Sequence, residues 1–194
     1  MKILDLQGAP VLSTGPAVLY GAPRLFFSAL PNVGTTITLA SGTAYFVYVG
    51  RPMQAIIPQF VNFNVSTAGA GGQTAEVGLF STPKPPSKGT GQTVTKLFAT
   101  NIVNSLTTVG FSRNTNAFTY IVPAGTNLWA GLRTAMATTQ PTMPGLCMDY
   151  NEGLILMAAG AGPLNAGTSW SAVTINPGAL ISAALAPDLR ISLD

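Results

Sequence analysis

The chain has 194 residues, which is enough for one ordinary domain with its own hydrophobic core. Only 8% of its residues are charged, against about 25% in an average globular protein. The nine cations are spread along the chain without a cluster, which argues against nucleic-acid binding, and the absence of histidine excludes Ser-His-Asp and Cys-His sites and His-ligated zinc.

Residues 1–34 contain a proline every six to eight residues among apolar side chains. Proline at this density prevents regular pairing and keeps a chain extended. The segment is either an irregular region packed on its own domain or an extended arm that lies on a neighbouring subunit. The apolar residues expected to form that subunit contact are Ile3, Leu4, Leu6, Val11, Leu12, Val18, Leu19, Tyr20, Leu25, Phe26 and Phe27.

Residues 35–194 have the pattern of a β domain. The clearest strand is 59–65, where Val61, Phe63 and Val65 alternate with asparagines, and the apolar run 44–49 predicts a strand covered on both faces. The turn-like segments 67–72 and 123–125 and the spacing of strands favour a sandwich or barrel. The other predicted strands are 35–39, 74–80, 93–99, 117–122, 126–134, 153–157, 169–175 and 189–193.

Helical signals are short and confined to 101–106 and 179–185, and the second could equally be a strand. The loop 81–89 is rich in proline and carries Lys84 and Lys88, so we expect it to be exposed and stiff. It is either a plain connector or a contact tip for a partner or receptor.

The carboxylates offer one pair to consider, Asp149 and Glu152, which lie in a turn-like polar segment with Asn151. A solvated loop is the simplest interpretation. A Ca²⁺ site built from these three side chains and an acid pair for glycan cleavage are the alternatives. Cys147 is expected to be an inert buried residue, and Glu76, in mid-strand, is expected at the surface or beside an arginine.

The two tryptophans, Trp129 and Trp170, could stack on sugar rings if they were exposed side by side. Lys84 and Lys88 would then be further ligand-binding candidates. Tryptophans in strands more often pack inward or at subunit contacts. No cofactor is expected, and no apolar run reaches the roughly 18 residues of a membrane-spanning helix.

Three stretches carry a family resemblance: VNFNVSTAG at 61–69, QTAEVGLF at 73–80 and VPAGTNLWAGLR at 122–133. With these, the chain resembles jelly-roll virion proteins of tailed phages, over about residues 44 to 194. Members of that group serve as head decorations, head fibres and tail-fibre or baseplate modules. The resemblance implies an all-β fold, a jelly-roll-like antiparallel β-sandwich over 35–194 with an extended, proline-containing N-terminal arm over 1–34.

It also implies a non-enzymatic structural role. We expect a capsid-decorating or head-fibre subunit, a homotrimer that is made in the host cytoplasm without a signal peptide and ends in the virion. Its expected partners are copies of itself and other virion proteins such as the major capsid protein. The alternative is a receptor-binding tail-fibre or baseplate module that binds host surface carbohydrate.

Overall fold

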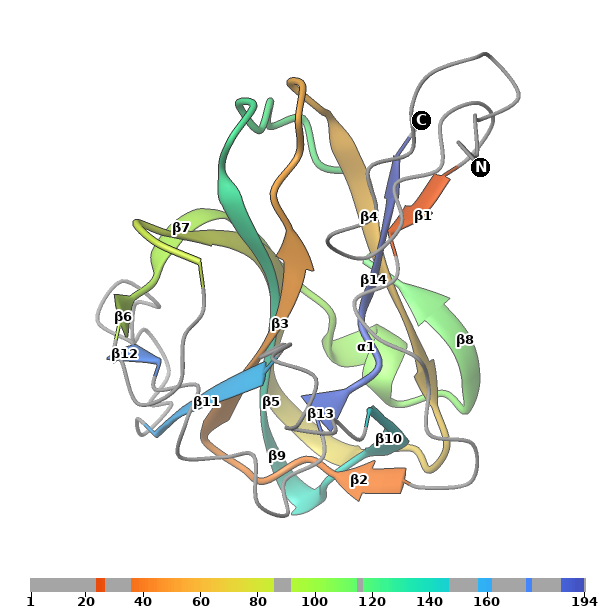
Figure 1. The fold of residues 1–194 in the computed structure, drawn as a ribbon. Coiled ribbons are helices and arrows are strands. Elements are labelled where there is room, and N and C mark those ends of the chain that lie inside the picture. The colour runs from red at the N-terminus through yellow and green to blue at the C-terminus, as the bar shows by residue number, and fades with distance from the viewer. Residues whose placement is uncertain are drawn as a thin grey trace, which may run out of the picture.

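The computed structural model describes residues 24–26, 36–85, 92–114, 117–146, 157–161, 174–175 and 186–193. Within these ranges the protein is built almost entirely of antiparallel strands, and the one helix is the single turn α1 (Val103–Leu106). The predicted all-β class is therefore confirmed, and α1 lies inside the predicted helical segment 101–106 (Figure 1).

The larger sheet has five strands in the order β11-β3-β9-β5-β7. Its centre is the pairing of β5 with β9, which runs from Ala70 opposite Thr139 to Thr82 opposite Asn127. The bounds of its strands are β3 (Thr43–Gly50), β5 (Ala70–Thr82), β7 (Thr95–Asn101), β9 (Asn127–Thr139) and β11 (Met157–Ala161).

A four-stranded sheet in the order β1-β14-β4-β8 lies across the core from the larger sheet (Figure 1). Its strands are β1 (Arg24–Phe26), β4 (Pro58–Val65), β8 (Gly110–Arg113) and β14 (Arg190–Leu193). Two small sheets complete the described fold. They consist of β2 (Thr36–Thr38), β10 (Thr142–Leu146) and β13 (Ala186–Pro187), and of β6 (Gln92–Thr93) and β12 (Thr174–Ile175).

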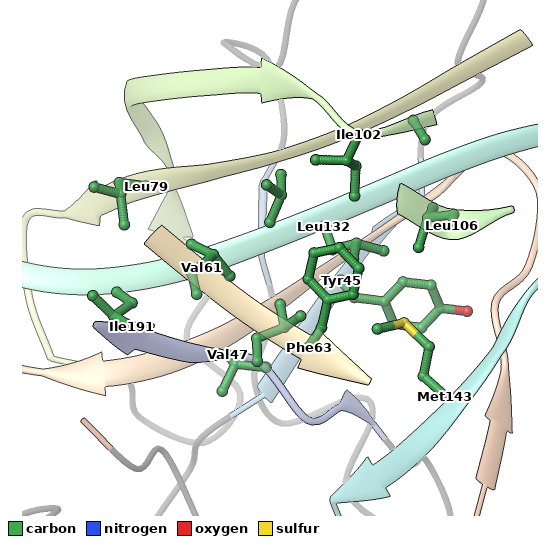
Figure 2. Close-up of a cluster of buried hydrophobic side chains, with 14 of the residues drawn as sticks. Tyr45, Val47, Val61, Phe63, Leu79, Ile102, Leu106, Leu132, Met143 and Ile191 are labelled. Carbon is green, nitrogen blue, oxygen red and sulfur yellow. The ribbon is translucent and has the colours of Figure 1, made fainter. Parts of the chain in front are cut away.

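The main core fills the space between the two larger sheets (Figure 2). Along β4, the side chains of Val61, Phe63 and Val65 are buried and Asn64 is exposed, as the sequence alternation predicts. Asn62 departs from the prediction, because it is only 5% exposed and its side-chain amide donates a hydrogen bond to the Arg190 carbonyl oxygen at 3.4 Å. Val47 and Leu132 are buried on the facing sheet. Each such side chain contributes about 1.5–3 kcal/mol when it is removed from water, so the alternation fixes the register of β4.

A second cluster lies on the opposite face of the five-stranded sheet and contains Phe46, Phe80 and Trp129, each without exposed surface. The Phe46 and Phe80 rings meet edge to face, with centroids 5.1 Å apart. Gly131 lies beneath them, and a Cβ there would be 2.5 Å from a Phe80 ring carbon. This sheet is therefore buried on both faces, which confirms the prediction for 44–49.

Two predicted features are wrong. Segment 67–72 was expected to be a loop, but β5 begins at Ala70, and the register with β9 shifts on both sides of Gly72. Gly71 has a φ of +67°, the left-handed conformation that a glycine bulge accepts, so the glycines bend a long strand instead of ending it.

Segment 117–122 was expected to be a strand, yet its backbone is tied to segment 56–59 only by an isolated bridge between Val122 and Ile56 and by the Phe118 amide, which donates to the Gln59 carbonyl oxygen at 2.7 Å. Phe118 and Val122 are buried and the residues between them are more exposed. The alternation here indicates an extended segment with one buried side, and such a segment need not be a strand of a regular sheet.

The predicted arm is described only at β1, where Leu25 lies opposite Ser192 and Phe26 opposite Ile191 of the same chain. The strand β1 thus belongs to the four-stranded sheet, and a contact of the arm with a neighbouring subunit stays a prediction. The remaining candidates for the arm contact, Ile3 to Tyr20 and Phe27, lie outside the described residues, and so does the predicted segment 179–185.

Candidate interaction surfaces

Trp129 is a core residue, so the inward packing favoured for a tryptophan in a strand is observed, and the exposed ring that stacking on sugar would need is absent at this residue. Its side chain is 0% exposed, its indole nitrogen donates a hydrogen bond to Thr82 Oγ1 at 2.9 Å, and its ring packs on Tyr48. A ring enclosed in this way has no free face for a ligand. The sequence did not show that both faces of β9 are covered. Trp170 lies outside the described residues.

Lys84 is exposed, and its backbone is held in place. Thr82 Oγ1 donates to the Lys84 carbonyl oxygen at 2.8 Å, and the Lys84 amide donates to Gln92 Oε1 at 3.1 Å. The amide of Gln92 in turn donates to the Pro85 carbonyl oxygen at 2.9 Å. The start of the loop is therefore exposed and fixed, as predicted. Lys88 lies outside the described residues, and ligand binding by either lysine stays a prediction.

The calcium candidates Asp149, Asn151 and Glu152 also lie outside the described residues, as does Cys147. Among the side chains that are described, no group of three or more His, Cys, Asp or Glu residues could hold a metal ion. The Ca²⁺ site therefore stays a prediction.

Glu76 has the arginine partner that was one of its two expected environments. It lies directly opposite Arg133 in the pairing of β5 with β9, and Arg133 Nε donates to its carboxylate at 2.6 Å. A second guanidinium nitrogen, Nη2, contacts the same carboxylate oxygen, Oε2, and Arg133 is only 5% exposed. The pair joins the two central strands on the face that carries the aromatic cluster.

The surface that we call the outer face lies on the four-stranded sheet, opposite the main core. Its side chains come from alternate positions of β4, β8 and β14 and from Asp188, which precedes β14. They are Phe60, Asn62, Asn64, Phe111, Arg113, Asp188, Arg190 and Ser192. Asn64, Phe111 and Arg113 are exposed, Asn62 is only 5% exposed, and the other four are partly buried. Phe111 is 76% exposed, which is the largest exposed fraction among the bulky apolar side chains described.

The strand register arranges this face in rows. Asn62 lies opposite Arg190 on one side and Arg113 on the other, and Asn64 lies opposite Phe111. The Arg113 guanidinium stacks on the Phe60 ring, 4.1 Å from its centroid. Arg190 makes three hydrogen bonds of 2.6–3.1 Å to the carboxylate of Asp188, which places both side chains on this face.

A second exposed apolar region, which we call the tip, lies where the β3–β4 connection meets segment 117–126. Its members are Met53, Ile57 and Ile121. Ile57 and Ile121 flank the bridge between Ile56 and Val122, so they lie opposite each other. Arg51 Nε donates to the Gly125 carbonyl oxygen at 2.7 Å and fixes this end of the molecule.

Neither surface was found from the sequence, which directed attention to residues 1–34. Residues 110–113 were not predicted to form a strand, because four residues are too few for alternation to stand out. A signal was nevertheless present in β4. Asn64 is exposed and indicates a solvated face at its end of β4, and an aromatic residue opposite it on the neighbouring strand would share that face.

Within the described part of the chain, no helix is both long and apolar enough to cross a membrane. The chain matches no protein-family model, and a search of curated proteins found no match either.

Proposed function

We propose that this protein is a non-enzymatic structural subunit of a tailed-phage particle, a capsid-decorating or head-fibre protein that works as a homo-oligomer. In this proposal the body is a jelly-roll-like β-sandwich and residues 1–34 supply an anchoring arm. The observation that carries the proposal is the presence of two separate places with exposed apolar side chains, the tip and the part of the outer face at Phe111, on a chain with few charges.

Exposed apolar side chains that gather in one place usually mark a contact with another molecule. The tip gathers Met53, Ile57 and Ile121, and Phe111 projects from the outer face beside exposed Val109. The two regions lie on different elements, so both can be covered at once. A subunit with two contact surfaces can bind a copy of itself and a different neighbour, such as the major capsid protein.

The charges that remain on the surface support the same conclusion. The two described carboxylates, Glu76 and Asp188, are both in ion pairs with arginines of the same chain. The cations outside these pairs whose side chains are described are Arg51, Lys84, Lys96 and Arg113. The described surface is therefore weakly cationic, and its association must depend on shape and apolar area, with an acidic neighbour favoured.

Immunogold labelling tests the proposal. Antibody raised against the purified chain should label the heads of the tailed phage that encodes it, in a regular pattern. Native mass spectrometry of the purified chain should give an oligomer, and a trimer is the expected mass. Unlabelled particles together with a monomer at all concentrations would overturn the structural role.

The alternative function, a tail-fibre or baseplate module that binds host carbohydrate, has one observation in its favour. Lys84 is exposed on a backbone that is fixed by Thr82 and Gln92, as a binding loop requires. In that case immunogold would label the tail, and a glycan array would show binding that is lost in Lys84→Ala and kept in Lys96→Ala.

A further inference from the structure

We infer that β1 is exchanged between copies of this chain, so that β1 of one copy pairs with β14 of a neighbouring copy in the oligomer. This inference rests on the proposed function, because it names the site at which the N-terminal arm of one subunit lies on the next. It depends on the place of β1 in its sheet, on its pairing and on the length of chain that joins it to β2.

The acceptor edge, by which we mean the edge of β14 that faces away from β4, has a strand seated on it in the structure. β1 lies along this edge in an antiparallel ladder of three residue pairs, of which Leu25 with Ser192 is the middle pair. Strand pairing uses backbone N–H and C=O groups, so β1 of a second copy satisfies the edge as well as β1 of the same chain does. The edge therefore defines its occupant as β1, and either copy can supply it.

The strand β1 can leave this edge at small cost. It is the outermost strand of the four-stranded sheet, and β14 is its neighbour in the described fold (Figure 1). Only three residues of β1 take part in the ladder. Its departure would leave β14 with an open edge, and folded proteins pair or cover such edges. A copy of β1 from a neighbouring subunit restores the same ladder.

The chain between β1 and β2 is long enough for exchange. Residues 27–35, nine in number, join the two strands and can span up to about 33 Å. Phe26 lies level with Val61 of β4, and β2 pairs with β10, whose Thr142 bridges to Thr67 just beyond the end of β4. Six residues of extended chain cover about 20 Å, and β1 lies two strands, about 10 Å, to the side of β4. The path within one chain is therefore roughly 20–25 Å.

The sequence of this linker favours the exchanged arrangement. Pro31 has a fixed φ near −65° and disfavours the helical conformation at Leu30, so the sequence predicts an extended linker. An extended linker is about 10 Å longer than the path within one chain and has to bend to return β1 to its own β14. A neighbouring subunit can accept the strand without that bend.

The exchanged ladder is the same as the ladder within one chain, so the linker and the other contacts between copies decide between the two arrangements. When other contacts hold the copies together, the tethered strand acts at an effective concentration on the order of millimolar, which compensates for its short length. The exchanged contact is also directional, because one copy donates β1 and the next accepts it. A directional contact can close into a ring and so fits the expected trimer.

Disulfide trapping in the full chain tests the inference. Leu25→Cys and Ser192→Cys replace two residues that lie directly opposite each other, at a Cα separation of about 4.5–5.5 Å that a disulfide accepts. Both substitutions are made with Cys147→Ser, so that the two new thiols are the only ones. After oxidation of the oligomer, a denaturing gel without reductant should shift the main band of this double variant from one chain to two and three linked chains.

A mixture of the two single-cysteine proteins identifies which chains pair. The Leu25→Cys protein and the Ser192→Cys protein, unfolded together and refolded, should form a linked heterodimer that mass spectrometry recognises. If β1 stays on its own chain, each of these cysteines has no partner, and the double variant forms an internal disulfide within a single chain. That result, or the absence of a disulfide of either kind, would overturn the inference.

The pair Asn64→Cys and Phe111→Cys is the matched control, again with Cys147→Ser. These residues also lie directly opposite each other, on β4 and β8, and both are exposed. Their double variant should give an internal disulfide, and a mixture of their single variants should give little linked heterodimer. Exchange is measured as the excess of heterodimer for β1 with β14 over this control, and equal yields contradict it.

The outcomes also separate the inference from the proposed function. An oligomer in native mass spectrometry whose β1 disulfide is internal removes the exchange and keeps the structural subunit. A chain that exchanges β1 but labels no phage particle keeps the exchange and removes the virion role. A monomer that labels phage heads removes the exchange and keeps the virion role, and a monomer that labels no particle removes both.

Discussion

The outward faces of the two larger sheets differ sharply although both follow the same alternation. On the five-stranded sheet, Phe46, Phe80 and Trp129 are all 0% exposed. On the four-stranded sheet, Phe111 is 76% exposed and Asn64 and Arg113 are also exposed. Period-2 alternation therefore identifies which side chains share a face, but it does not say whether that face meets water.

The composition of each face carries the missing information. The outward face of the five-stranded sheet, which we call the covered face, combines aromatic rings with Gly131, which leaves room for them, and the ion pair described on it joins two strands of the sheet. The outer face of the four-stranded sheet, which we also call the open face, combines asparagine, arginine and single aromatic rings, the mixture found at protein interfaces. Substitutions on the two faces should accordingly affect different properties, stability on one and association on the other.

The largest expected effect is that of Trp129→Ala. Removal of the buried indole leaves a cavity and deprives the buried Thr82 hydroxyl of its indole donor, so we expect a loss of about 3–5 kcal/mol in the free energy of unfolding. Urea denaturation monitored by circular dichroism measures it. Phe111→Ala should change the same quantity by no more than about 0.5 kcal/mol in dilute protein.

Trp129→Phe is the matched variant for this comparison. It keeps an aromatic ring against Tyr48 and loses the hydrogen bond to Thr82, so its cost should be clearly smaller than that of alanine. Equal losses for Trp129→Ala and Phe111→Ala would break the distinction between a covered and an open face.

A smaller effect is expected from the ion pair of the covered face. Glu76→Leu leaves the Arg133 guanidinium, on a residue that is 5% exposed, without this carboxylate. The expected loss in the free energy of unfolding is about 2–3 kcal/mol, less than for a fully buried pair, because Glu76 itself is partly exposed. The double variant Glu76→Leu with Arg133→Met should be more stable than Glu76→Leu alone. Thermal melts of the two variants measure the difference.

The corresponding pair of the open face is the control. The Asp188 side chain is only 12% exposed, but the Arg190 side chain is one-third exposed and stays solvated when its carboxylate is removed. The loss in the free energy of unfolding for Asp188→Asn should therefore be about 1–2 kcal/mol. If this substitution were as damaging as Glu76→Leu, burial would not be what separates the two faces.

Much of the fold could be predicted because its longest strands carry their own pattern. The alternation of β4 and the apolar run of β3 both follow from which side chains leave water, and both strands were confirmed, although Asn62 of β4 is buried against the expected pattern. The glycines at 69–72 were misread because a local turn signal and a bulge in a long strand use the same residue. Only the pairing with β9, which is distant in sequence, decides between them.

The candidate surfaces could be predicted less well. Whether Trp129 is covered depends on elements that pack on the outward face, and no local pattern encodes them. Phe111 becomes part of a surface only because β8 pairs with β4, some fifty residues earlier in the chain. Side chains that a sheet brings together from separate strands carry no spacing signal in the sequence.

The smallest expected effect concerns Tyr48, at the border of the covered face. Burial raises the pKa of its hydroxyl, and the nearby Arg51 charge offsets part of that rise. The folded state thus holds the Tyr48 hydroxyl proton more tightly than the unfolded chain does. The stability that this difference contributes is complete below about pH 10 and is lost as the pH rises through the raised pKa. Urea midpoints between pH 8 and 11 should fall less in Tyr48→Phe than in wild type. In Arg51→Gln the fall of the urea midpoint should be larger than in wild type, because the cation that favours the phenolate is gone. Parallel curves of midpoint against pH for all three proteins would mean that Tyr48 is as well solvated as a residue of the open face.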